Sequence, residues 1–500
     1  MINLARNTNQ AKALGEFAIQ FLKETSPSEE VLERLKLFHT DSVMCGLSAL
    51  ALNTNAPTVL RNEAMQYPKN PGARCFGSEV NIAPEKAALA NCAAVREWDA
   101  NGTVFGYSEG GGKAGEYGHN DYYGVAVAAA QAKKLNGEQT LKGMLLLDEI
   151  RGRLCEYFSL REHKIDHVLH GGIASAAAYG ALVGASPEQI EHAIGILVAH
   201  HVPFRAIRHG KELSDSKGSS AAFIAEQAIL SVHRALRGFI GPKDIFRNPQ
   251  SVFGVFGGST ESSSPFDLNL GIKGSDFSIM NMHFKLGLYE HQSAGAISSL
   301  LKLISQNPHI LTGEIVSINI YSYKDALRII GDPSKYSPSN RQSADHSMPF
   351  IIATLMSKAC QNPELIKHLD FDSFWKELML NPFDYTQEAI SDKTTSEFMK
   401  LIKFSYGGPE FDERYPEGIP TQVEIQLKDS KYTSGIEMFP PGHSKNFNSS
   451  ILDFKFHNLG NIALEDPRNC IEKLQNLDKL SKEQMESVYF WKYKRHNYKV

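Results

Sequence analysis

The chain has 500 residues, which is long for one small core, so we expect two or more domains. Hydrophobic residues make up 42% of it and charged residues 22%, a balance typical of soluble globular enzymes. The net charge is −4 and no long basic block is present, so nucleic acid is not expected as a partner. The most apolar run, residues 171–185, is shorter than a bilayer requires, so a membrane is not expected either.

The N-terminus lacks the basic start and apolar core of a secretory signal, and the early Glu16 is atypical of a mitochondrial presequence. The six cysteines contain no CxxC pair, which disfavours an iron–sulfur cluster and predicts reduced thiols. We therefore expect a cytoplasmic protein, or one of the mitochondrial matrix if the source is eukaryotic.

The first half of the chain has helical patterns throughout. Two S-x-x-E/Q boxes with Pro at the second position, Ser26–Glu29 and Ser186–Gln189, predict helix starts. No strand pattern is visible before about residue 275. We expect an all-helical domain over residues 1–275, with helices within 1–55 and at 85–100, 122–135, 141–160, 173–182, 190–198 and 219–236.

A Gly/Ser-rich stretch at 251–280 marks a boundary. Beyond it, apolar and polar residues alternate at 314–323 and 423–427, which predicts half-buried strands, with another strand running toward Phe439. Helices are expected at 291–305 and 348–359. We therefore predict a smaller α+β domain over 276–440. A helical tail over 441–500, with a capping box at Ser481, is expected to pack back and complete the first domain.

Residues 91–130 carry the densest group of chemically useful side chains. Asp99, Thr103 and His119 lie in a turn-rich segment between two Ala-rich runs, and a loop held by a rigid scaffold is a common place for chemistry. A polar surface loop with ordinary helix caps is an equally simple interpretation. The GYSEGGGK stretch is not a phosphate-binding Walker loop, because Tyr107 and Ala114 stand at required positions.

Residues 204–220 are rich in cations, and Lys217 precedes an Ala-rich run, so we expect an anion site rather than only a solvated loop. The cations include Arg205, Arg208, His209 and Lys211.

Three further places carry histidine. His163, His167 and His170 have spacing that a metal site could use, although caps or buried hydrogen bonds are the more common roles. His291 and the Asp345-His346 pair stand at predicted helix starts, where each alone would more often be a cap than a catalyst.

Five segments resemble the MmgE/PrpD family. Residues 96–103 (REWDANGT) are similar to the family's RWLDFNDT, residues 118–121 (GHND) to its GHPSDN, and residues 166–169 (DHVL) match its DHVL. Residues 284–291 are similar to its FK…H segment, and residues 343–349 (SADHSMP) to its ADHSLP. The segments occur in the family's order and span residues 96–349.

The resemblance implies a homodimer of mainly α protomers, each with an all-helical domain and a smaller α+β lid, and a cleft site that uses no metal or other cofactor. It carries over these site residues: Asp99, Thr103, His119, His167, Lys217 and His291. Family members include 2-methylcitrate dehydratases, cis-aconitate decarboxylases and an iminodisuccinate epimerase. This chain departs from the family at Gly102, where the family has Asp, at Ala100 and Asn120, and in a glycine-rich insertion before His119.

The resemblance favours a lyase that dehydrates a hydroxy-tricarboxylate such as 2-methylcitrate. His119 and His291 are the expected base and acid, in either order, with Asp99 orienting one imidazole, because imidazole titrates near neutral pH. The substrate carboxylates are expected to meet these side chains: Lys217, Arg208, His167, Thr103 and Tyr323. Decarboxylation of cis-aconitate, epimerisation of a dicarboxylate, and non-catalytic carboxylate binding remain alternatives.

Overall fold

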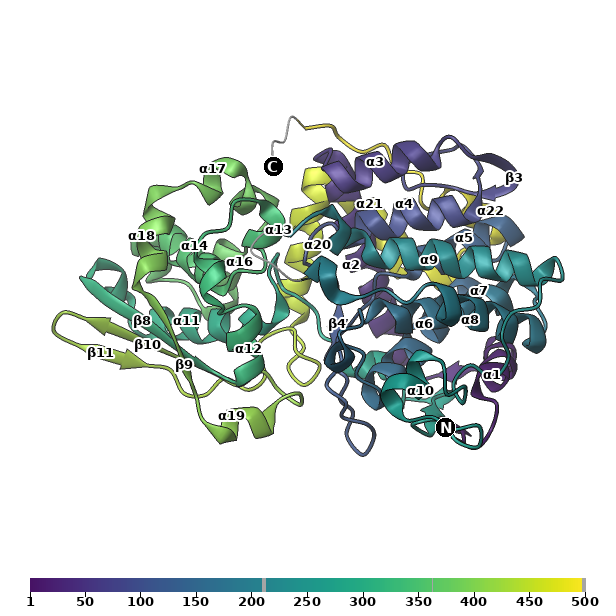
Figure 1. Cartoon of the computed structure of the whole chain (residues 1–500). Coiled ribbons are helices and arrows are strands. Elements are labelled where there is room, and N and C mark those ends of the chain that lie inside the picture. The colour runs from purple at the N-terminus through teal and green to yellow at the C-terminus, as the bar shows by residue number, and fades with distance from the viewer. Residues whose placement is uncertain (209–212, 362, 497–500) are drawn as a thin grey trace.

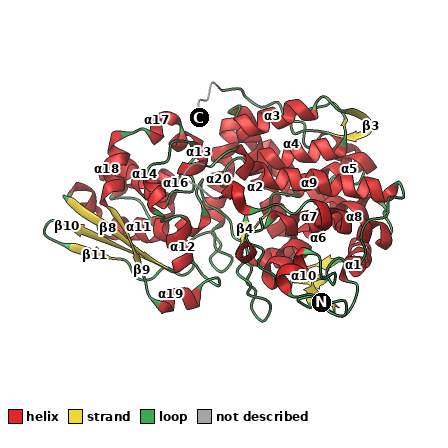
Figure 2. Cartoon of the chain, viewed as in Figure 1, coloured by secondary structure: helices red, strands yellow, loops and turns green. Residues whose placement is uncertain are grey.

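The computed structural model describes residues 1–208, 213–361 and 363–496, and these are mainly α-helical (Figure 2). Helices from the N-terminal half lie at one side of the molecule, and a small sheet with its own helices lies at the other (Figure 1). The first helices and their bounds are α1 (Gln10–Glu24), α2 (Glu29–Ala51), α3 (Asn55–Ala64), α4 (Pro84–Arg96), α5 (Tyr123–Lys133), α6 (Gly137–Tyr157), α7 (Val168–Val183), α8 (Pro187–His200), α9 (Asp215–Leu236) and α10 (Val252–Gly257).

Small residues let these helices pack closely. Helix α7 contacts α6, α8 and α9, and α4 contacts α9. A Cβ atom at Gly171 would come within 2.0 Å of the Tyr122 ring, and one at Gly172 within 2.6 Å of Ile224. The Ala- and Gly-rich patterns therefore reflect helix contacts that larger side chains would prevent. The predicted capping box at Ser186 is confirmed, because Ser186 accepts from the Gln189 backbone and Gln189 from the Ser186 backbone.

The prediction that no strand precedes residue 275 is wrong. Short pairings occur there, and segments of two or three residues cannot show alternation. The strands are β1 (Ile2–Leu4) with β6 (Leu268–Leu270), β2 (Ser26–Pro27) with β7 (Lys273–Gly274), β4 (Thr103–Val104) with β5 (Gly118–His119), and the separate β3 (Pro68–Ala73).

The cap of α2 is also corrected. Ser26 lies in β2, and Ser28 is the residue whose hydroxyl accepts from the Val31 backbone. Pro27 therefore stands before the cap and not at the first helical position.

A four-stranded sheet of order β11–β10–β8–β9 confirms the predicted strands. Strand β8 (Ile315–Ser322) pairs antiparallel with β10 (Thr421–Leu427) and parallel with β9 (Ile402–Tyr406). Ile318 and Ile320 are buried on the predicted face, and Val316 is exposed. The last strand, β11 (Lys431–Thr433), ends well before Phe439. Beyond β11, Glu437 forms an isolated antiparallel β-bridge with Thr421 of β10.

Helices pack against this sheet, and further helices come after it in the chain. Helix α11 packs on β10, and α14 packs on α18. After residue 440 the chain returns to the N-terminal helices, where α20 contacts α2 and α22 contacts α5. The capping box at Ser481 is confirmed with Gln484. The helices are α11 (Ala294–Gln306), α12 (Lys324–Ile329), α13 (Arg341–Ala344), α14 (Met348–Gln361), α15 (Pro363–Ile366), α16 (Phe371–Leu378), α17 (Gln387–Ile390), α18 (Lys393–Leu401), α19 (Pro409–Arg414), α20 (Ser449–Ala463), α21 (Pro467–Gln475) and α22 (Lys482–Ser487).

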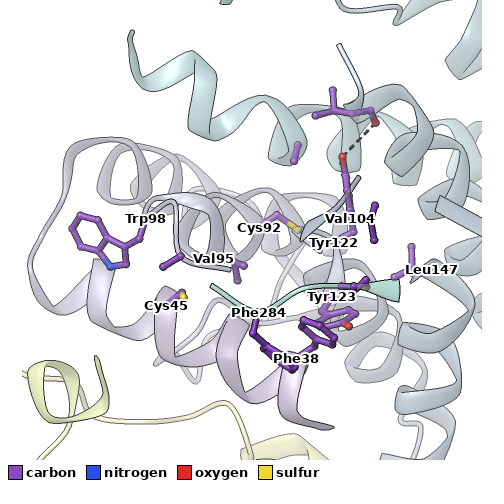
Figure 3. Close-up of a cluster of buried hydrophobic side chains, with 14 of the residues drawn as sticks. Phe38, Cys45, Cys92, Val95, Trp98, Val104, Tyr122, Tyr123, Leu147 and Phe284 are labelled. Atoms are coloured by element: carbon purple, nitrogen blue, oxygen red, sulfur yellow. Dashed lines mark hydrogen bonds between the residues drawn. The ribbon is translucent and has the colours of Figure 1, made fainter. Parts of the chain in front are cut away.

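The core joins segments that are distant in sequence. Phe38 of α2 stacks on Phe284, with ring centroids 3.8 Å apart (Figure 3). Trp98, which follows α4, donates through its indole nitrogen to the Ser48 hydroxyl of α2 at 2.9 Å. Among the described residues no single helix is both long and apolar enough to cross a membrane, and α2 with α3 meets that standard only as a pair bent by 92°.

Candidate active site

A cavity of about 600 Å³ is lined by residues from α4, α9 and the loops between the N-terminal helices, and by residues of α12, the turn after it and His346. Its described lining holds three acidic residues (Asp99, Glu290 and Asp332) against eight lysines and arginines, so the cavity attracts anions. The cations are Arg96, Arg161, Lys164, Arg205, Arg208, Lys217, Arg328 and Lys335.

Asp99 lies at the centre of the buried charges. Its Oδ1 accepts from Arg96 Nη1 at 3.0 Å and from the ammonium of Lys285. Its Oδ2 lies 2.6 Å from His346 Nε2 and 3.5 Å from Lys217 Nζ. Burial raises the pKa of Asp99, but Arg96, Lys285, His346 and Lys217 together hold that pKa well below its usual range. Asp99 is therefore ionised and holds a group of cations at the cavity wall.

His346 connects Asp99 to a second buried ion pair. Its Nδ1 lies 2.5 Å from Asp345 Oδ1 and 3.2 Å from Lys217 Nζ. Asp345 in turn accepts from Arg341 Nη1 at 2.9 Å. Burial and the Lys217 ammonium lower the pKa of His346, and the two carboxylates oppose that shift.

Asp99, Asp345 and His346 are also the one metal-compatible group found among the described residues, with ligand atoms within 4.8 Å. Because protein cations already pair with both carboxylates, we do not assign a metal to this group. The three histidines whose spacing a metal site could use form no such group within the described residues. They are His163, His167 and His170. His170 instead pairs with the Phe158 carbonyl at 2.8 Å, and His163 stacks on Phe158.

The β4–β5 hairpin positions two predicted residues on the cavity. Thr103 pairs with His119 across the hairpin, and both line the cavity. The His119 ring lies 5.3 Å from that of His167, another lining residue. Burial lowers the pKa of both imidazoles well below its usual range, and nearby arginines reinforce the shift. Both rings are therefore neutral near pH 7, a state in which an imidazole nitrogen can accept a proton.

Lys217 lines the cavity from the first turn of α9. The helix begins at Asp215, so Lys217 lies inside it. The sequence analysis places Lys217 before the helix, and that prediction is wrong. Burial lowers the pKa of Lys217 to about 7, and Asp99 and Asp345 oppose that shift. The ammonium is thus easily lost unless an anion binds beside it.

Arg208 lines the cavity but is already engaged. Its Nε and Nη2 donate to the two carboxylate oxygens of Asp166 at 2.7 and 3.1 Å. Arg205, on the same 3-10 turn, also lines the cavity, and its buried Nη1 has no hydrogen-bond partner among the described residues. The predicted cations His209 and Lys211 lie outside the described residues.

His291 and Tyr323 are not among the lining residues. Phe105 lies on the cavity wall with its ring 5.5 Å from that of His291, which is buried. Tyr323 stacks on Tyr415 at 4.3 Å, and the Tyr415 ring lies 5.8 Å from that of Phe105. Six of the eight predicted side chains therefore line one cavity, and the other two, His291 and Tyr323, are buried outside its lining.

Sequence analysis missed several charged residues of the site, among them Lys285, Arg161 and Glu290. It assigns no role to Lys285, which stands in a quoted motif, and none to Arg161, which follows the expected helix 141–160. Arg161 lines the cavity and pairs with Asp325 at 2.6 Å. Glu290, next to His291, also lines the cavity, and burial together with nearby Asp99 raises its carboxyl pKa to about 7. An acidic residue directly before a histidine at a helix start was the only available signal.

The fold and the site define a mainly helical protein with a buried, cation-rich cavity. The model of the MmgE/PrpD N-terminal domain matches residues 12–264, and the chain belongs to that family. It is 25% identical to the mitochondrial 2-methylcitrate dehydratase of Yarrowia lipolytica, an alignment that covers 83% of this chain and 77% of the relative. It is 24% identical to the 2-methylcitrate dehydratase of Escherichia coli O157:H7, with 89% of each chain covered. The enzyme of the same name from Salmonella typhi is also 24% identical, with 81% and 80% covered.

Proposed function

We propose that this protein is a hydro-lyase that dehydrates a hydroxy-tricarboxylate, with 2-methylcitrate as the leading substrate. The observation that carries the proposal is the excess of cations around a cavity that also presents neutral His119. A substrate with three negative charges needs such a cavity, and the relatives carry the name of this reaction.

The proposed chemistry begins with His119. The neutral imidazole takes the proton from the carbon next to a carboxylate, and Lys217 and Arg205 bind carboxylates and stabilise the developing charge. Thr103 and His167 hydrogen-bond the substrate, and Asp99 keeps Arg96, Lys217 and His346 in position. The leaving hydroxyl requires a proton from an acid on the cavity wall. His291 is a poor choice for that acid because it does not line the cavity, and Tyr323 does not line it either. No metal or cofactor is required by this scheme.

The test is turnover of 2-methylcitrate by purified protein, followed by the absorbance of the enoate product. We expect His119→Ala to lower kcat by about 10²–10⁴-fold, the usual contribution of a general base. His200→Ala, which changes an exposed histidine, is the matched control. A full rate in His119→Ala would remove His119 from the mechanism.

The same cavity suits the family's other reactions. Carbon dioxide release from cis-aconitate would identify a decarboxylase, and inversion of a chiral dicarboxylate would identify an epimerase. A non-catalytic carboxylate-binding protein would bind tricarboxylates in calorimetry and turn over none of these acids.

We also propose the domain arrangement and assembly of the chain. Residues 1–275 with 441–500 form the helical domain, and residues 276–440 form a lid, which is supported by cavity-lining residues from both parts. A homodimer is supported by exposed apolar side chains on the helical part, at Phe239, Ile240 and Val255. Sedimentation of the purified protein tests the dimer. The six free cysteines support a reducing compartment, either the cytoplasm or the mitochondrial matrix.

A further inference from the structure

We propose that Glu290 is the acid that protonates the leaving hydroxyl group, an inference that rests on the proposed dehydration. Glu290 lies five residues after Lys285, directly before the 3-10 turn His291–Ser293, and its side chain lines the cavity. Its backbone N–H donates to the Asp345 carbonyl at 2.9 Å, and the neighbouring Tyr289 N–H donates to the Asp99 carbonyl at 3.1 Å. Two backbone hydrogen bonds thus hold this carboxyl against the central group of charges.

Among the residues that the structure describes, the side-chain hydrogen bond of Glu290 uses one carboxylate oxygen and leaves the other to carry a proton. Its Oε2 accepts from the Gln292 backbone N–H at 2.8 Å, as the cap of a short 3-10 turn. A neutral carboxylic acid has one accepting oxygen and one O–H donor. With Oε2 engaged as the acceptor, Oε1 is the atom that can carry the proton.

The other cavity acids fit this role less well. Asp99 is paired with cations and stays ionised, so it has no proton to give. The neutral imidazoles of His119 and His167 are proton acceptors in this state. Burial raises the pKa of Glu290, on the cavity wall, into the neutral range, to about 7. A bound tricarboxylate would raise it further, because like charge opposes ionisation.

The charged and titratable groups acting on Glu290 come from several elements. Asp99 raises its pKa, whereas Lys285 and Lys217 lower it. Tyr117 and Tyr323 also interact with its charge, and burial keeps both of these phenols neutral near pH 7.

The proposed step is balanced in protons. His119 accepts a proton from carbon, the electron pair of that C–H bond forms the C=C bond, and the C–O bond breaks. The Oε1 proton of Glu290 joins the leaving hydroxide and forms water. Exchange with solvent then returns the proton from His119 to Glu290, and the enzyme is restored.

The experiment measures kcat and KM of the full-length enzyme against pH with 2-methylcitrate. In the unsubstituted enzyme kcat is expected to fall as pH rises through Glu290 ionisation, because the acid must be protonated. Glu290→Gln keeps an acceptor for Gln292 but has no acidic proton. We expect it to lower kcat by about 10²–10⁴-fold, with a smaller change in KM. The alkaline fall should become weaker, because only the part caused by Lys217, whose pKa is about 7, would remain. Glu290→Asp should recover part of kcat and the alkaline fall.

Glu162→Gln, an exposed change beside Arg161, is the matched control and should leave the profile unchanged. Retention of kcat within about threefold in Glu290→Gln, with the alkaline fall intact, would overturn the role of Glu290 and leave the dehydratase proposal standing. A complete lack of dehydration by the unsubstituted enzyme would instead overturn the dehydratase proposal, and with it the acid role. Infrared difference spectra of the unliganded protein give an independent readout. The neutral carboxyl band lost near pH 7 should be weaker in Glu290→Gln by the share of one carboxyl, because burial raises the pKa of Glu116 and Glu156 to about 7 as well. An unchanged band in Glu290→Gln would also overturn the proposal.

Discussion

Asp99 Oδ2 lies 2.6 Å from His346 Nε2, and this contact joins the loop after α4 to the segment between α13 and α14. Both side chains also line the cavity. The charged centre of the site is therefore shared between two parts of the chain that are far apart in sequence. Its arrangement depends on one carboxylate that several cations contact at once.

Asp99→Asn is expected to destabilise the protein by about 3–5 kcal/mol, because it leaves buried cations without their anion. Unfolding in urea measures the change, and Asp429→Asn, an exposed change in the β10–β11 turn, is the control. The depressed pKa of Asp99 contributes stability that is present above the unfolded pKa and is lost as pH falls. The Asn variant should therefore lose less stability on acidification. Equal urea midpoints for the variant and the parent would show that Asp99 does not hold these cations in place.

Lys217→Met should weaken tricarboxylate binding most at low pH. The Lys217 ammonium has a pKa near 7, so it is mainly charged at pH 6 and mainly neutral at pH 8.5. Removing a charged hydrogen-bond donor costs about 1.5–3 kcal/mol, or roughly 10–100-fold in Kd, at the lower pH. Calorimetry with citrate at both pH values tests this. The ratio of the variant's Kd to the parent's should shrink as pH rises, and a constant ratio would contradict the assigned titration.

Asp325→Asn should weaken the link between the helical part and the sheet-bearing part at the cavity. Asp325 holds Arg161, whose guanidinium lies 5.0 Å from the Tyr117 ring centroid. The pair is partly exposed, so we expect a cost of about 1 kcal/mol, seen as a few-fold increase in KM with little change in kcat. Steady-state kinetics at low and high salt provide the measurement. The increase should be smaller at high salt, and Asp453→Asn on the exposed face of α20 is the control.

Gly102→Ala should destabilise the fold although it adds only one methyl group. A Cβ at this position would lie 2.6 Å from Phe38 Cε1 and 3.1 Å from Asn120 Oδ1. Phe38 is itself stacked on Phe284 and has little room to move (Figure 3). We expect a loss of about 1–3 kcal/mol, measured by thermal or urea unfolding.

Gly435→Ala is the matched control for that change, because a Cβ there meets nothing within 4 Å. A Gly102→Ala variant as stable as the control would mean that Phe38 can rearrange. The packing of Phe38 also gives a physical reason why this chain has glycine where the family segment has Asp.

Much of the fold could be predicted because its signals are local. Alanine and glycine spacing indicated α4, α5 and α7, and alternation indicated β8 and β10. The pairings of β1, β2 and β4 could not be predicted, because two or three residues carry no period and their partners come from distant loops. The predicted cap at Ser26 was displaced to Ser28 for the same reason, since β2 uses Ser26 in a long-range pairing.

For the site, residue type and motif alone singled out Asp99, His119 and Lys217, because an anion-binding site requires such groups whatever their exact positions. The tertiary structure decided how they are used. Burial lowers the pKa of Lys217 and raises that of Glu290, and folding buries His291 beside Phe105, outside the cavity lining. These properties depend on desolvation and on neighbours brought together by folding, which no local pattern in the chain encodes.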